Sequence, residues 1–186
     1  MDQRILELID ELDSLRGARD DHWQVPRIEG NLLYQIALSS GARTIVEVGT
    51  SYGFSGLFWG AALQRVGGTL HTIDNSSKKF DSSKATFERA GLAKTIVNHL
   101  GDAMQVLPKV PGPLDLAFID SGDKKSTRAL FDIIWPRIRA GGAVITDNIT
   151  THQSELADFV GYVRGLKEAS SIAVPIGNGI EWTIKA

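Results

Sequence analysis

Residues 44–56 are Thr44-Ile-Val-Glu-Val-Gly49-Thr-Ser-Tyr-Gly53-Phe-Ser-Gly56, a short apolar run followed by a glycine-rich turn. The apolar run is typical of a buried strand, and residues 55–66 are expected to form the helix that follows it. Glycines let a ligand approach the backbone closely, and the first N–H groups of a helix attract an anion. In open α/β sheets, ligands bind at this edge, outside the carboxyl ends of the strands. The stretch therefore predicts an α/β fold with a ligand site after this strand, or else a tight turn without a ligand.

Strands and helices alternate outward from this stretch. Further strands are expected at residues 69–74, 95–100, 114–120 and 143–147, and helices at residues 77–90, 102–107, 123–139 and 154–168. Strict alternation of this kind predicts a parallel sheet covered by helices on both faces. The glycine pair Gly141-Gly142 is expected to end the helix that precedes the fifth strand.

The last part of the chain breaks this alternation. Residues 171–176 and 180–184 resemble strands, and Gly177-Asn178-Gly179 lies between them. An Asn-Gly pair is typical of a hairpin turn, because both turn residues must take positive φ. We therefore expect the last strand to run antiparallel to the others.

The N-terminal residues 1–40 are expected to supply helices to a single domain that covers residues 1–186. The first helix has one apolar stripe, made of Ile5, Leu8, Ile9, Leu12 and Leu15. This helix either packs on its own domain, or covers the site or forms a dimer. Residues 17–26 are expected to be a loop, and residues 27–40 a second helix that ends at Gly41.

Composition and charge exclude several classes of protein. The chain is 42% hydrophobic and 23% charged, as in ordinary globular proteins, and it has no cysteine for disulfides, thiolate catalysis or Cys-ligated zinc. Its net charge is −2 without a cluster of basic residues, which argues against nucleic acid as a partner. No apolar signal core begins the chain, and no segment approaches the ~20 apolar residues that cross a bilayer. We therefore expect a cytoplasmic enzyme with no membrane partner.

A dinucleotide site is the main alternative for the glycine-rich turn. Such a site needs the spacing G-x-G-x-x-G, whereas the glycines here are at positions 49, 53 and 56. Glu47 is poorly placed for a pyrophosphate but suits a cationic ligand. The glycine spacing therefore disfavours a nicotinamide-dependent oxidoreductase.

Acidic residues also follow the second and third strands. Asp74 ends the second strand, where a carboxylate can accept hydrogen bonds from both hydroxyls of a ribose. Alternatively it caps the following helix, although Asn75 or Ser76 can do that instead. Gly101-Asp102-Ala103 follows the third strand, and its backbone and carboxylate can bind an adenine. Together these positions predict a nucleoside along one edge of the sheet.

A further group of oxygen ligands is expected beside the nucleoside. Asp120 ends the fourth strand and Asp147-Asn148 the fifth, and these strands should be neighbours. Two carboxylates and an amide oxygen at one point suit Mg²⁺, which prefers oxygen ligands. The alternative is that these side chains cap the helices that follow them.

Taken together, these pieces resemble one family of enzymes. They are residues 45–55, Ile73-Asp74, Gly101-Asp102-Ala103, Phe118-Ile119-Asp120, residues 141–148 and the closing residues 175–185. In this order they resemble the cation-dependent O-methyltransferases, the family of catechol and caffeoyl-CoA O-methyltransferases. The resemblance covers residues 25–186, and the pairing of Asp120 with Asp147-Asn148 points to this family among methyltransferases.

The resemblance implies a Rossmann-like α/β methyltransferase fold, whose seven-stranded, mostly parallel sheet has an antiparallel last strand and helices on both faces. It implies S-adenosylmethionine as cofactor, with contacts from Glu47, Gly49, Thr50, Ser55, Asp74, Asn75, Asp102, Ala103 and Asp120. It also implies Mg²⁺ or another divalent cation, bound by Asp120, Asp147 and Asn148. The matching residues in relatives suggest that Ser55 binds the methionine carboxylate and Asp74 the ribose.

The resemblance further implies methyl transfer to a hydroxyl of a catechol-like or other small acceptor, whose pKa the cation would lower. Relatives usually have a lysine base three positions after the first metal aspartate, where this chain has Asp123. Lys124 is therefore the first candidate base, unless it and Lys125 lie on a solvated helix face, and His152 is the second. Asp123 is then a further metal-shell carboxylate or a helix cap.

Other residues and functions remain open from the sequence. Trp23 either stacks on the substrate or packs its loop, whereas His71 and His99 lie within strands and are expected to be structural. The alternatives to the cation-dependent enzyme are a metal-independent methyltransferase and a cofactor-binding protein without catalysis. We expect a small-molecule acceptor as partner. A homodimer is one possible oligomeric state.

Overall fold

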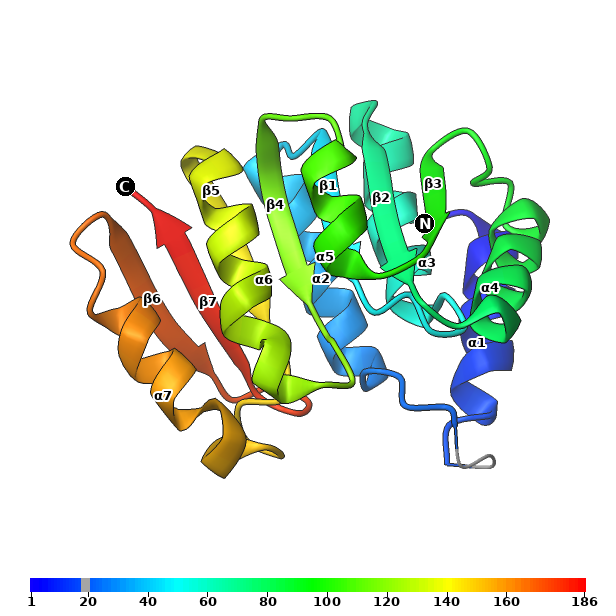
Figure 1. Ribbon diagram of the computed structural model, residues 1–186. Coiled ribbons are helices and arrows are strands. Elements are labelled where there is room, and N and C mark those ends of the chain that lie inside the picture. The colour runs from blue at the N-terminus through cyan, green and yellow to red at the C-terminus, as the bar shows by residue number, and fades with distance from the viewer. Residues whose placement is uncertain (18–20) are drawn as a thin grey trace.

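The computed structural model describes residues 1–17 and 21–186, and these form one seven-stranded sheet (Figure 1). Residues 18–20 of the expected loop lie outside the described residues. The strands are β1 (Thr44–Val48), β2 (Thr69–Asp74), β3 (Ile96–Leu100), β4 (Leu114–Ile119), β5 (Ile138–Thr146), β6 (Ala169–Val174) and β7 (Ile180–Lys185). Their order is β3-β2-β1-β4-β5-β7-β6, and β7 pairs antiparallel with both β5 and β6. The predicted Rossmann-like α/β fold and its antiparallel last strand are confirmed.

Helices cover both faces of the sheet (Figure 1). One apolar core includes residues of α1 (Gln3–Ser14), α2 (Arg27–Ser40), α3 (Phe54–Val66) and α4 (Ser77–Arg89). A second core, on the other face, includes α6 (Thr127–Ile134), α7 (Gln153–Arg164) and the 3-10 turn η1 (Leu107–Lys109), with the short α5 (Ala103–Val106) beside it. Neighbouring residues such as Ile45 and Val46 enter different cores, which explains why strands of a sheet covered on both faces are continuously apolar.

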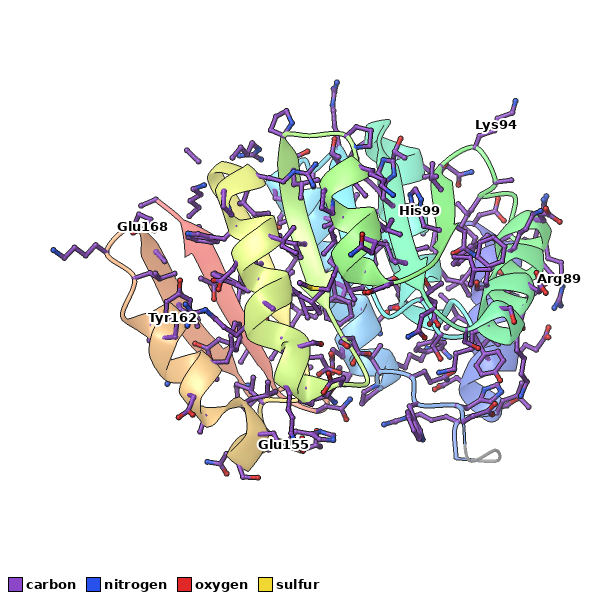
Figure 2. The ribbon with its side chains drawn as sticks, in the orientation of Figure 1. Arg89, Lys94, His99, Glu155, Tyr162 and Glu168 are labelled. Atoms are coloured by element: carbon purple, nitrogen blue, oxygen red, sulfur yellow. The ribbon has the colours of Figure 1, made fainter. Side chains whose placement is uncertain are left out.

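Aromatic rings join the helices of the second face. Tyr162 of α7, labelled in Figure 2, contacts Phe131 of α6 edge-on, with ring centroids 6.1 Å apart. Phe131 also stacks on Trp135 at 5.1 Å. These contacts join α6 to α7 and to the 3-10 turn that follows α6.

The first helix packs on its own domain, as the first of the two alternatives predicted. Its stripe of Ile5, Leu8, Ile9 and Leu12 is buried in the same core as α3. The side-chain amide of Gln24, in the segment between α1 and α2, donates to the carbonyl of Leu12 at 2.9 Å. The start of the chain is thereby connected to the segment that leads into α2.

The predicted helix over residues 123–139 is wrong at both ends. The structure has the 3-10 turn η2 (Lys124–Ser126), then α6, then the 3-10 turn η3 (Trp135–Arg137), and β5 already begins at Ile138. Pro136 has no N–H for a helical hydrogen bond, so the helix ends before it. Gly141 therefore does not end a helix but lies inside β5, where its φ of 73° accompanies a register shift against β4.

Two details of the C-terminal part also differ from expectation. The helix predicted to reach residue 168 ends at Arg164, because Gly165 follows it and the chain then enters β6. The hairpin between β6 and β7 takes positive φ at Gly177 and Gly179 but not at Asn178. The connection is five residues long, so it is not the two-residue turn that Asn-Gly predicts.

Within residues 1–17 and 21–186, the helices are too short or too polar to span a bilayer.

Candidate functional site

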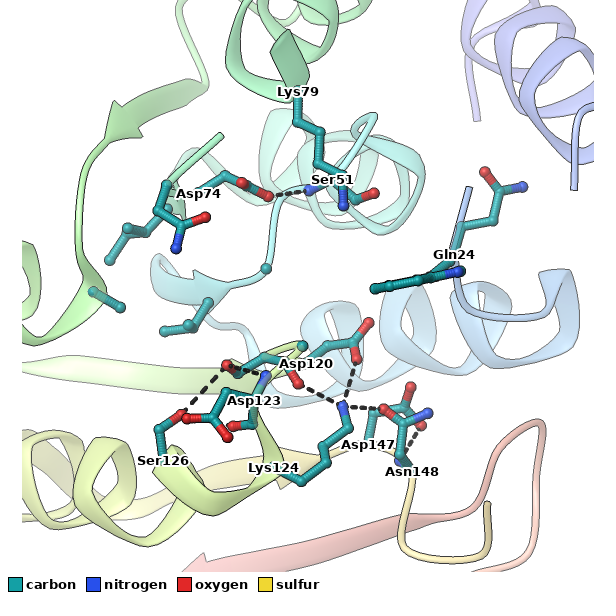
Figure 3. A pocket seen from close by; sticks show the side chains of 18 of the residues that line it. Gln24, Ser51, Asp74, Lys79, Asp120, Asp123, Lys124, Ser126, Asp147 and Asn148 are labelled. Atoms are coloured by element: carbon teal, nitrogen blue, oxygen red, sulfur yellow. Dashed lines mark hydrogen bonds and ion pairs between the residues drawn. The ribbon is translucent and has the colours of Figure 1, made fainter. Parts of the chain in front are cut away.

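A cavity of about 1070 Å³ lies outside the carboxyl ends of the parallel strands (Figure 3). The cavity lies where the strand order reverses, because β2 pairs with one side of β1 and β4 pairs with the other. Of the predicted cofactor residues, six line the cavity: Gly49, Asp74, Asn75, Asp102, Ala103 and Asp120. The predicted metal ligands and both candidate bases also line it: Asp147, Asn148, Lys124 and His152.

The turn after β1 requires glycine where it passes β4. Gly49 has a φ of 104°, and a Cβ there would lie 2.2 Å from the main-chain oxygen of Asp120. The ends of β1 and β4 therefore approach each other more closely than a side chain would permit. Ser51, two residues on, also has a positive φ, of 48°, and its N–H donates to Asp74 Oδ2 at 2.8 Å. The backbone of the turn is thus fixed by the carboxylate at the end of β2.

Three of the predicted cofactor residues are buried and do not line the cavity: Glu47 in β1, Thr50 within the turn and Ser55 in the first turn of α3. The hydroxyl of Thr72 donates to Glu47 Oε2 at 2.6 Å and lies 2.6 Å from the hydroxyl of Thr50. Burial raises the pKa of Glu47 to about 7, against the opposing effect of the Thr72 hydrogen bond. Glu47, through Thr72, thus holds Thr50 and the turn in place.

The residues expected to bind a nucleoside are spread along the ends of β2 and β3. Asp74 accepts from the N–H of Ser76 at 2.9 Å, and the Ser76 hydroxyl, not Asp74, caps α4. Asp102 caps α5 by accepting from the N–H of Met104 at 2.9 Å, and it also lines the cavity. One buried hydroxyl on the cavity wall, that of Ser51, has no hydrogen-bond partner among the described residues. This part of the cavity therefore offers carboxylates to a ligand, beside a buried and unpaired hydroxyl.

The structure brings Asp120, Asp147 and Asn148 together with Lys124, as Figure 3 shows. The Lys124 ammonium donates to Asn148 Oδ1 at 2.5 Å and to the carbonyl of Ser121 at 2.6 Å, and it lies 3.4 Å from Asp120 Oδ1. Asn148 has a φ of 71°, a conformation that asparagine adopts more readily than most residues. Non-glycine residues in this region often mark functional sites, because the surrounding structure must enforce them.

Negative charge is concentrated and poorly solvated at this end of the cavity. Burial, and then repulsion from Asp147, raises the pKa of Asp120 to about 7, although Lys124 acts in the opposite direction. Burial likewise raises the pKa of Asp147. The two carboxyls therefore lie where a cation would stabilise their charged forms.

Sequence reasoning missed two residues at this site, Glu29 and Asn178. Glu29 is buried in the first turn of α2, where an acidic residue ordinarily interacts with the helix dipole and signals no site. It accepts from the N–H of Asn178 at 3.1 Å, and the Asn178 side chain donates to Asp147 Oδ2 at 3.2 Å. Burial and the nearby Asp147 raise the pKa of Glu29 to about 9. Only Asn178 had a local signal, its place in a hairpin turn at the sheet edge.

The structure separates the two lysines after Asp120. Lys124 is 8% exposed, so it does not lie on a solvated face, whereas Lys125 is exposed. Asp123 caps η2 through a hydrogen bond from the N–H of Lys125 at 3.1 Å. His152 lies on the cavity wall with its Nδ1 3.2 Å from the Thr151 hydroxyl. Both candidate bases are thus at the cavity.

Aromatic residues near the cavity differ in exposure. Trp23 is 71% exposed at the cavity wall, and the Lys79 ammonium lies 5.6 Å from the centre of its ring. The ring is therefore available to a ligand and is not packed into its loop. His71 and His99, by contrast, form a ring-to-ring hydrogen bond of 3.1 Å between β2 and β3, away from the cavity (Figure 2 labels His99).

Comparisons with known proteins agree with this geometry. Residues 46–149 match a family model described as a methyltransferase domain. The chain is 31% identical over 147 residues to a catechol O-methyltransferase of Mycobacterium tuberculosis, which covers 76% of this chain and 66% of that protein. It is also 36% identical over 165 residues to a Mycobacteroides abscessus protein provisionally named an O-methyltransferase, which covers 81% and 76% of the two chains.

Solved structures share the fold over the whole chain. An O-methyltransferase of Bacillus cereus, in complex with S-adenosylhomocysteine, superposes with a TM-score of 0.85 and 23% identity, covering 100% of this chain and 92% of that one. At this identity the similarity shows the fold. The chain spans just under two thirds of the length of the Mycobacterium tuberculosis relative.

Proposed function

Because the chain belongs to the methyltransferase family, we propose that it is an S-adenosylmethionine-dependent O-methyltransferase. Its acceptor is a small molecule with a catechol-like hydroxyl, and it uses Mg²⁺ or another divalent cation. One observation supports this most directly: a single cavity is lined by carboxylates from the ends of β2, β4 and β5 and from the segment after β3. Such a lining attracts a positively charged ligand and disfavours a pyrophosphate.

The residues present fit S-adenosylmethionine. Asp74 would bind the ribose end, since it lines the cavity and its carboxylate is held there by the N–H of Ser51. Asp102 and Ala103 would border the base, and Gly49 and Asp120, both on the cavity wall, would border the remainder. When bound, this cofactor supplies an electrophilic methyl group on a sulfonium.

The residues present also fit a divalent cation. Asp120, Asp147 and Asn148 would hold it through oxygen atoms, the donor type that Mg²⁺ prefers. Three acids here have raised pKa values: Glu29 and Asp147, which are buried, and Asp120, which is half-buried. Lys124 and Lys79 oppose the rise in the pKa of Asp120. A bound cation would supply the missing positive charge and lower the pKa of an acceptor hydroxyl.

The chain's own side chains would then position the acceptor and take its proton. Trp23, exposed at the wall, offers a face on which an aromatic ring can stack. Lys124 and His152 are the two candidates for the proton acceptor, and Lys124 would first have to leave the oxygens to which it now donates. Holding donor and acceptor in line accounts for much of the rate in such transfers.

Calorimetry and methyl-transfer assays test this proposal. We expect S-adenosylmethionine to bind and NADH not to bind, and aromatic vicinal diols to be methylated with Mg²⁺ but not with chelator. Full activity with chelator and in Asp147→Ala would instead support the metal-independent methyltransferase. Binding of S-adenosylmethionine without methyl transfer would support a cofactor-binding protein. If S-adenosylmethionine does not bind, the proposal is overturned. The cytoplasmic location and the homodimer stay predictions.

A further inference from the structure

The Lys124 ammonium is surrounded by oxygen atoms. Its three closest acceptors are the Asn148 side-chain oxygen at 2.5 Å, the Ser121 carbonyl at 2.6 Å and Asp120 Oδ1 at 3.4 Å. An ammonium has three N–H donors, so these contacts match its full capacity. The side chain is 7% exposed, which leaves water little access to the charge.

The local backbone directs Lys124 to this position. Asp123 caps η2, and Lys124 is the first residue of that turn, four residues after Asp120. The Lys124 side chain turns back toward the end of β4, where its ammonium meets Asp120 Oδ1 and the carbonyl of Ser121. Lys125, the next residue, is exposed. The two lysines therefore have the same charge and adjacent positions but opposite environments.

Two of the oxygens that contact Lys124 belong to the proposed cation site. A divalent ion bound to Asn148 Oδ1 and Asp120 would lie within a few ångströms of the ammonium as it is placed here. Two positive charges at such a distance in a poorly solvated pocket repel each other strongly. The ammonium and the ion are thus alternative partners for the same oxygens.

We propose that Lys124 competes with the divalent cation for Asn148 and Asp120, so that the ion binds only when the lysine side chain moves away from these oxygens. This inference rests on the cation site of the proposed function. Lys124 therefore lowers the affinity of this site for the ion when no other ligand is bound. Displacement of the lysine by the ion also frees its amine to face the cavity, where the acceptor would lie.

Mn²⁺ binding to the cofactor-free protein tests the competition, measured by loss of the free-ion signal in electron paramagnetic resonance. Removal of the charge in Lys124→Met should tighten Mn²⁺ binding by ~10-fold or more. Lys125→Met removes the same charge at an exposed position and should change the affinity less than twofold. Lys124→Arg retains the charge and should bind Mn²⁺ no more tightly than the unmodified chain. In the double variant Lys124→Met with Asp147→Asn, the increase in Mn²⁺ affinity should disappear.

The possible results separate this inference from the proposed function. Equal Mn²⁺ affinity in Lys124→Met and the unmodified chain would overturn it, as would an equal gain in Lys125→Met. If no variant binds Mn²⁺, both the inference and the cation site fail, whereas S-adenosylmethionine binding to the same samples would show that the methyltransferase site stands. Circular dichroism checks folding, and Lys124→Gln replaces Lys124→Met if that variant does not fold.

Discussion

Glu47 shows how a single residue under the cavity affects the whole protein. It is a fully buried carboxyl whose pKa is raised to about 7, mainly by burial. It accepts a hydrogen bond from the hydroxyl of Thr72, which also lies beside the hydroxyl of Thr50 in the turn. An acid in this position is neutral in the folded chain at a pH where the unfolded chain has already lost its proton. Folding stability should therefore depend on pH through this residue.

The substitution Glu47→Gln isolates that dependence. Between pH 4.5 and about 7 the unfolded chain releases the Glu47 proton first, so the stability of the unmodified protein falls as pH rises. Relative to Glu47→Gln, we expect the unmodified protein to lose roughly 3 kcal/mol over this window. Urea unfolding of both proteins at pH 5 and pH 8 measures the difference, and a difference that does not change with pH would contradict a raised pKa.

At the scale of elements, the contact between α2 and the β6–β7 connection completes the acidic end of the cavity. Glu29 of α2 accepts from the N–H of Asn178, and a Cβ on Gly177 would lie 2.2 Å from Glu29 Oε2. The hairpin can approach the helix this closely because Gly177 has no side chain and a φ of 62°. Asn178 is thereby positioned to donate to Asp147. Helix α2 thus helps to place a residue at the cavity although Glu29 is not on its wall.

Two substitutions of Glu29 should lower the free energy of unfolding by different amounts at pH 7. Glu29→Ala removes buried atoms and leaves the Asn178 N–H unpaired, which should cost about 2–4 kcal/mol. Glu29→Gln should cost less than about 1 kcal/mol, because the neutral acid and the amide can both accept from that N–H. Urea unfolding gives both values. Equal costs for the two variants would contradict the expectation that an uncharged acceptor can replace Glu29.

At the scale of the whole molecule, the cavity exists only when the sheet is complete. Its lining comes from the ends of β1, β2, β4 and β5, from the segment after β3, from the hairpin before β7 and from the segment between α1 and α2. These segments are brought together by parallel pairing of strands that are far apart in the chain. A ligand of this cavity should therefore bind the folded chain and not the unfolded one.

S-adenosylhomocysteine, the proposed product, should accordingly stabilise the whole fold. At 100 times its Kd, binding to the folded state alone contributes about 2.7 kcal/mol to stability, seen as a higher unfolding temperature. Asp74→Ala at the same ligand concentration should lose most of this gain. NADH serves as the matched control, and stabilisation by NADH without stabilisation by S-adenosylhomocysteine would favour the oxidoreductase alternative.

The sequence by itself determined the order of strands and helices, the antiparallel last strand and the edge at which the polar residues gather. These features depend on local patterns: apolar runs, glycine-rich turns, and carboxylates such as Asp74, Asp120 and Asp147 directly after strands. Pro136 was a local signal for the end of α6, but the early start of β5 was not predictable in this way, because the register shift beside Gly141 depends on pairing with β4.

Only the tertiary structure decided which polar groups are buried together. Glu29 and Asn178 are 149 positions apart in the chain, and no local pattern connects them. Lys124 and Lys125 are indistinguishable in composition, yet one lies among three oxygens and the other is exposed. Burial and charge pairing arise from packing between distant segments, so the chemistry of the lysine beside Asp120 and Asn148 became visible only in the folded chain.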